Sequence, residues 1–190
     1  MRSSLKHESG RKRGRLRRWA LALALCLPSP LASAADPQPE LQVKAAYLAR
    51  LAPFVVWPGT LFTGPNVPLA LCIQGDDPFG QMLDQMTSGQ GVGSHPIIVR
   101  RIERLDADSG CQIAYLGGSP AQSQAAALKA VDGKPVLTVT DGDGEGGGKG
   151  IVHFILIGGR VRFEIDAGRA DQAGLTISSK LLALAADVKR

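Results

Sequence analysis

The amino-acid sequence predicts an α/β fold, a three-layer sandwich with a mixed sheet that has a parallel centre and an antiparallel C-terminal hairpin edge. Between residues 41 and 140, short apolar runs typical of buried strands alternate with segments of helical periodicity. That order indicates parallel pairing with helices on both faces. Residues 151–165 form two further apolar runs joined by Gly158-Gly159, a pair that tight hairpins favour.

The first predicted elements are a helix, a strand and a second helix. The first helix must end before Pro58, because the residue that precedes a proline avoids the helical conformation. Residues 69–74 read as a buried strand, and Asp77 is placed to cap the next helix, with Pro78 in its first turn. The apolar residues of the first helix recur at helical spacing: Leu41, Ala45, Leu48, Ala52 and Val55.

Three further strands and a helix complete the predicted parallel part. Residues 97–102, 111–116 and 136–140 read as strands. Ser119 offers a cap, with Pro120 after it, to an alanine-rich helix before the last of these strands.

Short elements follow the hairpin. Asp166 begins a helix that Gly174 ends, and Ser178 caps a last helix after a brief extended segment.

Residues 1–34 have the composition of a cleaved signal peptide. They hold eight of the 22 basic residues of the chain and one acid, then an apolar run over 19–27 and a small-residue cleavage site that ends at Ala34. The apolar run is shorter than the roughly 20 residues that span a bilayer. We therefore expect a periplasmic protein in which residues 35–190 form a single domain.

The export route has alternatives. Arg17-Arg18 permits the twin-arginine route, but the residues after it match that signal poorly, which favours the general secretory pathway. Cys26 could mark a lipoprotein, but the bulky Leu25 precedes it where lipoprotein processing favours a small residue. A cleaved product without a lipid anchor is expected.

Removal of the leader changes the charge of the protein. The whole chain has a formal net charge of +5, whereas residues 35–190 hold 14 basic and 16 acidic residues, a net charge near −2. Only Arg100, Arg101 and Arg104 form a small basic cluster, and a solvated strand end explains it. We expect no nucleic-acid partner, since such a partner requires a basic face.

Two cysteines, Cys72 and Cys111, remain after cleavage. Both fall on predicted neighbouring strands, and the periplasm is oxidising, so we expect one disulfide that closes a loop of about 40 residues. The alternative is a pair of buried free thiols, because cysteine also packs as a small apolar residue.

The sequence offers no catalytic residue, cofactor site or complete metal site. His95 and His153 belong to no recognisable nucleophile or metal motif, so an enzyme is not expected. The loop 141–150 resembles the first half of a calcium loop, but Val152 stands where the bidentate glutamate is required. Weak calcium binding and a solvated loop are the two interpretations.

Three aromatic residues surround the end of the first predicted helix. Phe54, Trp57 and Phe62 could line an apolar ligand-binding pocket, and Trp57 lies in a loop before Pro58. The alternative is that these side chains close the core. The pocket interpretation would make the protein a small-molecule sensor.

The ordered set of these features resembles the YfiR family of periplasmic proteins. The stretches that carry the resemblance span nearly the whole predicted domain in the right order: residues 43–48, 54–58, 71–80, 136–141, 161–166 and 173–182. The resemblance implies a non-enzymatic repressor that binds the periplasmic sensor domain of an inner-membrane diguanylate cyclase and represses cyclic di-GMP synthesis. An outer-membrane lipoprotein would sequester the repressor, and a homodimer is implied.

The resemblance also assigns roles to residues. Cys72 and Cys111 match a cysteine pair of the family, whereas Gly146 and His153 stand where some relatives have a second pair. We place the partner-binding surface on the hairpin edge and on the turn that follows Leu175, with Ile165 for apolar contact and charged residues for register. Its residues are Arg162, Glu164, Ile165, Ile177, Ser178, Ser179 and Lys180. A periplasmic small-molecule-binding sensor module is the alternative function, and an enzyme is the third.

Overall fold

The computed structural model describes residues 37–142 and 147–190. The predicted signal peptide, residues 1–34, lies outside the described residues, and so do residues 143–146 of the calcium-like loop. Residues 35–190 form one compact unit. Within the described ranges, no helix is both long and apolar enough to cross a membrane.

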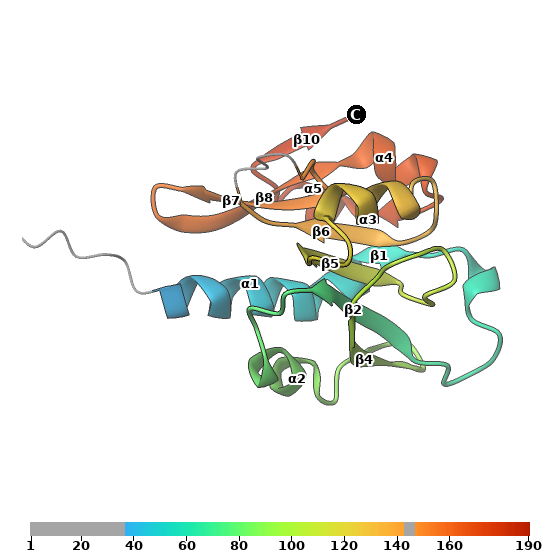
Figure 1. Ribbon diagram of the computed structural model, residues 1–190. Coiled ribbons are helices and arrows are strands. Elements are labelled where there is room, and N and C mark those ends of the chain that lie inside the picture. Colours follow the sequence, from blue (N-terminus) through green and yellow to red (C-terminus); the bar gives the residue numbers. More distant parts are fainter. Residues whose placement is uncertain (1–36, 143–146) are drawn as a thin grey trace, which may run out of the picture. The chain divides into compact units, whose positions relative to one another are not determined.

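A mixed eight-stranded sheet has the strand order β10-β8-β7-β6-β5-β2-β4-β3 (Figure 1). Strands β4, β2, β5, β6 and β7 are mutually parallel neighbours, and the β7–β8 pair is antiparallel, which confirms the predicted α/β fold class. The strands are β2 (Leu69–Gly75), β3 (Gly91–Val92), β4 (His95–Ile102), β5 (Ile113–Gly118), β6 (Leu137–Thr140), β7 (Val152–Ile157), β8 (Arg160–Asp166) and β10 (Asp187–Lys189).

Strand β10 was not predicted. It pairs in parallel with β8, where Asp187, Val188 and Lys189 face Glu164, Ile165 and Asp166. The hairpin therefore lies one strand in from the edge of the sheet along these three residues. The remaining part of β8, residues 160–163, has no strand on its outer side within the described ranges.

The first helix, α1 (Pro37–Leu51), ends earlier than predicted. Pro53 rather than Pro58 ends it, because a proline lacks the N–H that would continue the helix and clashes with the carbonyl four residues before it. A 3-10 turn (Ala52–Phe54) follows, and β1 (Val55–Val56) then pairs antiparallel with β9 (Thr176–Ile177) as a separate two-stranded sheet. The prediction that Val55 belongs to the helix is wrong.

The remaining helices are α2 (Gln81–Thr87), α3 (Gln124–Ala130), α4 (Ala167–Gln172) and α5 (Ser179–Leu182), with a 3-10 turn at Gly59–Leu61. Asp166 and Ser178 cap α4 and α5 as predicted, through hydrogen bonds from Arg169 N–H and Leu181 N–H.

The predicted caps of α2 and α3 were misplaced. Asp77 accepts hydrogen bonds from Phe79 and Gly80 in a turn before α2, and Ser123 rather than Ser119 caps α3.

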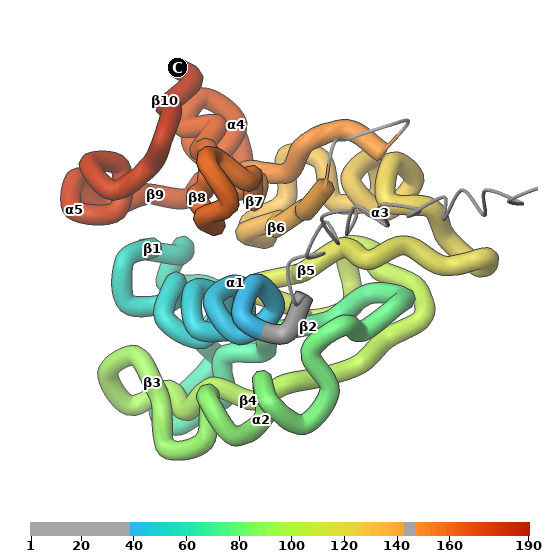
Figure 2. The backbone as a smooth tube through the Cα atoms, turned by 90° about the vertical axis from the view of Figure 1, so that its left-hand side faces the viewer, coloured from blue at the N-terminus to red at the C-terminus, as the bar shows by residue number. Residues whose placement is uncertain are grey.

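Helices cover both faces of the sheet. Residues of α1 and α2 belong to the larger apolar core, whereas Ala127 of α3 belongs to a smaller core on the other face, together with Cys72 and Cys111. Figure 2 shows α1 and α3 on opposite sides of the central strands. The three layers agree with the predicted sandwich.

Candidate functional site

Three residues predicted to bind a partner lie on β8, and their side chains alternate between its two faces. Arg162 is exposed and Glu164 is half-buried. Ile165 is 1 % exposed and belongs to the larger apolar core. The expectation that Ile165 offers apolar contact to a partner disagrees with this position, because alternate residues of a strand point to opposite faces.

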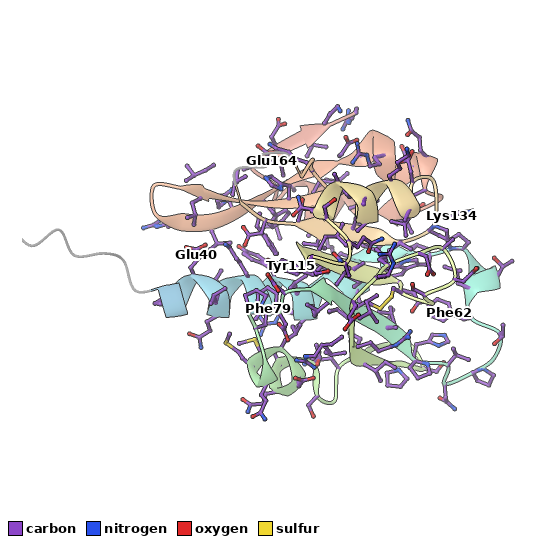
Figure 3. The ribbon with its side chains drawn as sticks, in the orientation of Figure 1. Glu40, Phe62, Phe79, Tyr115, Lys134 and Glu164 are labelled. Carbon is purple, nitrogen blue, oxygen red and sulfur yellow. A yellow bond between two sulfur atoms is a disulfide. The ribbon has the colours of Figure 1, made fainter. Side chains whose placement is uncertain are left out.

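Glu164 belongs to a row of polar side chains that crosses four strands. Three pairs of directly opposed residues on neighbouring strands form the row: Thr140 and His153, His153 and Glu164, and Glu164 and Asp187. Direct partners on neighbouring strands share one face of a sheet. Lys149 Nζ lies 2.6 Å from Glu164 Oε2, so the carboxylate is held by an ion pair. Figure 3 shows Glu164 on this part of the sheet.

A cavity of about 290 Å³ opens beside this row. Three acidic and three basic side chains line it, so it is polar without a strong net charge, and Lys189 Nζ lies 3.2 Å from Asp166 Oδ2 in a second ion pair. The charged lining residues are Lys149, Glu164, Asp166, Arg169, Asp187 and Lys189. Groups held in this way offer fixed charges to a partner and set its register.

His153 is buried at the centre of the row. Its Nδ1 lies 2.8 Å from Thr140 Oγ1, which also accepts the N–H of Gly150. Burial lowers the pKa of His153 below its ordinary value, and the positive charge of Lys149 lowers it further. The neutral ring is therefore a structural partner of Thr140.

The second predicted segment of the partner surface lies at the junction of β9 and α5. Ile177 pairs with Val55 across the small sheet, and Ser178 N–H donates to the Phe54 carbonyl. Ser179 and Lys180 are exposed on α5.

The chain returns from α5 to β8. The N–H of Ala186 donates to the Phe163 carbonyl over 2.8 Å, just before β10 pairs with β8. The two predicted segments thus lie on elements joined by this short return.

The aromatic residues predicted as a ligand pocket pack against the larger apolar core. Trp57 is buried, and its indole N–H donates to the Gln112 carbonyl over 3.1 Å. The ring of Phe62 stacks on His95 with centroids 4.2 Å apart, and Phe54 is a half-buried neighbour of the core. Phe62 lies far along the molecule from Glu164 (Figure 3). These packing contacts correspond to the alternative interpretation of the three residues.

The disulfide between Cys72 and Cys111 is present, as predicted. Cys72 lies in β2 and Cys111 lies just before β5, the neighbouring strand. Both residues are buried in the smaller core, between the sheet and α3. The bridge is therefore shielded from solvent, which is typical of a structural disulfide rather than a redox switch.

A buried ionic cluster that sequence reasoning missed joins α1 to the carboxyl end of β6. Lys44 is 5 % exposed, and its ammonium group forms ion pairs with Glu40 and, over 2.7 Å, with Asp141. Burial raises the pKa of Tyr115, and the charge of Asp141 raises it further.

Asp141 is also the first acid of the calcium-like loop. Its Oδ2 is occupied by the Lys44 ammonium, and its Oδ1 accepts the Gly142 N–H over 2.7 Å. Within residues 37–142 and 147–190, no group of three or more acidic, histidine or cysteine side chains is arranged to hold a metal ion.

The place where open parallel sheets bind ligands is closed in this protein. Such ligands enter at the carboxyl ends of the strands, where the strand order reverses, here between β2 and β5. Asp76 N–H donates to the Gly118 carbonyl over 2.9 Å, so the two loops touch. A side chain at Gly75 would meet Gly118 O at 2.1 Å, and one at Gly117 would meet Asp76 O at 2.2 Å. The crevice is filled by backbone.

Comparison with known protein families identifies the family of this chain. Residues 41–186 match the family model described as YfiR/HmsC-like. No curated protein matches the chain at a significant level. The match covers nearly all of the described domain and confirms the resemblance seen in the sequence.

Proposed function

Because the chain belongs to the YfiR/HmsC-like family of periplasmic regulators of diguanylate cyclase signalling, we propose that it is a periplasmic repressor. In this proposal it binds the sensor domain of an inner-membrane diguanylate cyclase and represses cyclic di-GMP synthesis. The family match over residues 41–186 carries the proposal. The protein acts without catalysis or a cofactor, and an outer-membrane lipoprotein and homodimer formation belong to the same proposal.

Repression of this kind needs only a difference in affinity. A binder that prefers the inactive form of the sensor domain shifts the equilibrium by that difference, and a change from mostly active to mostly inactive requires roughly 5 kcal/mol. A rigid surface with fixed charges can supply such a difference. The ion pairs Lys149–Glu164 and Lys189–Asp166 hold charges of this kind on β8 and β10.

We place the contact surface on the exposed charges of this region. Arg162 and Glu164 on β8 and Lys180 on α5 would set the register of the partner, and Ser179 would offer a hydroxyl. Ile165 contributes through the core by holding β8 in place. Ile177 and Ser178 fix the position of α5 through β9 and the cap.

The variant Glu164→Lys tests the surface. It should weaken binding to the cyclase sensor domain and raise cellular cyclic di-GMP, because it reverses the charge at the centre of the proposed contact. Folding should change little, by about 1 kcal/mol or less, because the Lys149–Glu164 pair is partly solvated, with 55 % of the Lys149 side chain and 29 % of the Glu164 side chain exposed. Cyclic di-GMP is measured in cells that carry each variant in place of the parent.

Two controls separate binding from folding. The swap Lys149→Glu with Glu164→Lys restores the ion pair while keeping the reversed charge at Glu164, so it should still fail to repress. Repression recovered by the swap would mean that Glu164 acts only through its ion pair. Lys129→Glu, at an exposed position of α3, should leave repression unchanged. A gene deletion that leaves cyclic di-GMP unchanged under all growth conditions would refute the repressor function.

We also propose that residues 1–34 are removed on export. The periplasmic protein should begin at or near Ala35 and lack Cys26, because the cleavage site ends at Ala34. Intact-mass measurement of protein from the periplasmic fraction checks this. A lipid-modified chain that begins at Cys26 would contradict it.

A further inference from the structure

The outer half of the β7–β8 hairpin extends beyond its neighbouring strands. Strand β6 pairs with β7 only at Val152 and His153, and β10 pairs with β8 only from Glu164 onward. Residues 154–163 are therefore a two-stranded ribbon with no other strand beside it in the described part of the chain. Figure 1 shows its turn projecting past the other strands of the sheet.

The tip of this ribbon carries large apolar side chains in solvent. Leu156 is 54 % exposed and Ile157 is 53 % exposed. Gly158 and Gly159 form the turn with φ of 57° and 72°, a left-handed conformation that glycine adopts without strain. Exposed aliphatic residues that gather at one projecting point mark a contact surface.

Basic side chains stand beside the apolar ones. Arg160 is the register partner of Ile157, and Arg162 is the register partner of Ile155. Both arginines are exposed. Residues 151–163 contain no acidic residue, so the ribbon has a local charge of +2 although the domain as a whole is slightly acidic.

We propose that the hairpin tip, residues 156–162, inserts into the interfacial region of an anionic phospholipid membrane. Aliphatic side chains at the turn would enter the boundary between headgroups and acyl chains, and the two guanidinium groups would bind lipid phosphates. Amphipathic segments with basic and aliphatic side chains bind membrane surfaces in this way. The inference goes beyond the proposed repressor function, for which it would place the protein close to a membrane-bound cyclase.

The length of the apolar and basic part of the ribbon matches the depth to which interfacial segments enter a membrane. Two residues separate the Ile155–Arg162 pair from the Ile157–Arg160 pair, which is about 7 Å along a strand. This matches the burial of roughly 5–10 Å that interfacial segments reach. Unpaired backbone groups along the ribbon would stay among the headgroups, since they cannot enter the hydrocarbon without partners. Long arginine side chains reach the phosphates from this depth.

A second copy of the chain fits the ribbon less well. Strand β10 limits the open edge of β8 to residues 160–163, so only a short ladder could form. Self-pairing there would also bring Arg160 and Arg162 of two copies together, and like charges on opposed strands repel.

Binding of an acidic protein would explain only part of the exposed surface at the hairpin tip. Leu156 and Ile157 are adjacent on a strand, so their side chains point to opposite faces of the ribbon. A protein surface covers one face, whereas a fluid lipid interface surrounds both. The lipid interface is therefore the occupant that satisfies the arginines and both aliphatic residues together.

Vesicle sedimentation tests the proposal with residues 35–190, which form one compact unit. The parent should bind vesicles that contain phosphatidylglycerol and should bind pure phosphatidylcholine much more weakly. Leu156→Ser with Ile157→Ser should lower the partition coefficient roughly tenfold or more, because the buried apolar area is lost. Arg160→Gln should lower it about fivefold on anionic vesicles and little on neutral ones.

A matched control uses an exposed aliphatic residue outside the ribbon. Leu184 is 57 % exposed, so Leu184→Ser removes a similar area and should leave vesicle binding unchanged. Circular dichroism should show that all variants fold. Absence of parental binding to anionic vesicles, or an equal loss in Leu184→Ser, would overturn the proposal.

Two other outcomes would also overturn it. A double serine variant that becomes monomeric while vesicle binding persists would assign the tip to a second copy. One that loses only its binding to the cyclase sensor domain would assign the tip to that protein. Vesicle binding does not depend on the cyclase. If gene deletion refutes the repressor function, the vesicle experiment therefore still tests the membrane proposal.

Discussion

Replacing both Cys72 and Cys111 with alanine is expected to lower the free energy of unfolding by roughly 2 to 5 kcal/mol. The bridge joins residues 39 positions apart, and the chain-entropy model gives about 4 kcal/mol for a loop of that length. Both cysteines are buried against α3, so the variant also loses packed sulfur atoms from the smaller core. Urea unfolding of residues 35–190 measures the change.

The parent provides the control for this experiment. Unfolding of the parent in a strong reductant should approach that of the double alanine variant, since reduction removes the same cross-link from the unfolded chain. Non-reduced parent should contain no free thiol. Two titratable thiols in the native protein, or equal urea midpoints for parent and variant, would contradict the structural role of the bridge.

Lys44→Met is expected to lower the free energy of unfolding by about 2 to 3 kcal/mol. Methionine keeps much of the length and apolar packing of the side chain, so the loss comes from the ion pairs with Asp141 and Glu40. The variant leaves Asp141 with 20 % of its side chain exposed and without its ammonium partner. Partial solvation of the two carboxylates keeps the cost below that of a fully buried pair.

The effect of Lys44 should depend on pH in a defined direction. Burial lowers the pKa of Lys44, but the hydrogen bonds and charges of Asp141 and Glu40 outweigh it, and the folded pKa lies above the ordinary value of 10.5. From neutral pH up to pH 10.5 the Lys44 ammonium therefore contributes its full stabilisation, and this contribution is lost as the pH rises through the raised pKa. Above neutral pH, the stability difference between parent and Lys44→Met should shrink only when the pH becomes strongly alkaline.

Lys129→Met is the matched control, because Lys129 is exposed on α3. It should change the free energy of unfolding by about 0.5 kcal/mol or less at every pH. A Lys44→Met variant as stable as the parent at neutral pH would show that the cluster contributes nothing to folding.

The central strands and the hairpin were predictable because their signals are local. Apolar runs mark β2, β5 and β6, and Gly158-Gly159 lies in the turn of the hairpin. Strand β10 could not be predicted in the same way. Of the three residues of β10 only Val188 is apolar. The extended conformation of the strand comes from pairing with β8, which is distant in the sequence.

Errors at helix ends have a common physical origin. Several residues near an end could each stop or cap the helix, and local contacts decide between them. Pro53 ends α1 before Pro58 is reached, and Ser123 caps α3 although Ser119 is followed by a proline. Ser119 instead bonds to Gln122 in the preceding turn.

The candidate site was predictable only in part. Alternation along β8 already separates Arg162 and Glu164 from Ile165, so the burial of Ile165 had a signal in the sequence. The Lys44–Asp141 pair had none, because its members are 97 residues apart and only the fold brings them together. The row from Thr140 to Asp187 likewise depends on strand register across four strands.

The small sheet of β1 and β9 has a consequence for biogenesis. Residues 55–56 find their partners only at residues 176–177, so the segment after α1 waits for most of the domain to be synthesised before it can pair. Contacts between distant residues slow folding, because a long loop must close first. The N-terminal part of the chain therefore cannot complete its native pairing while the C-terminal part is still being made.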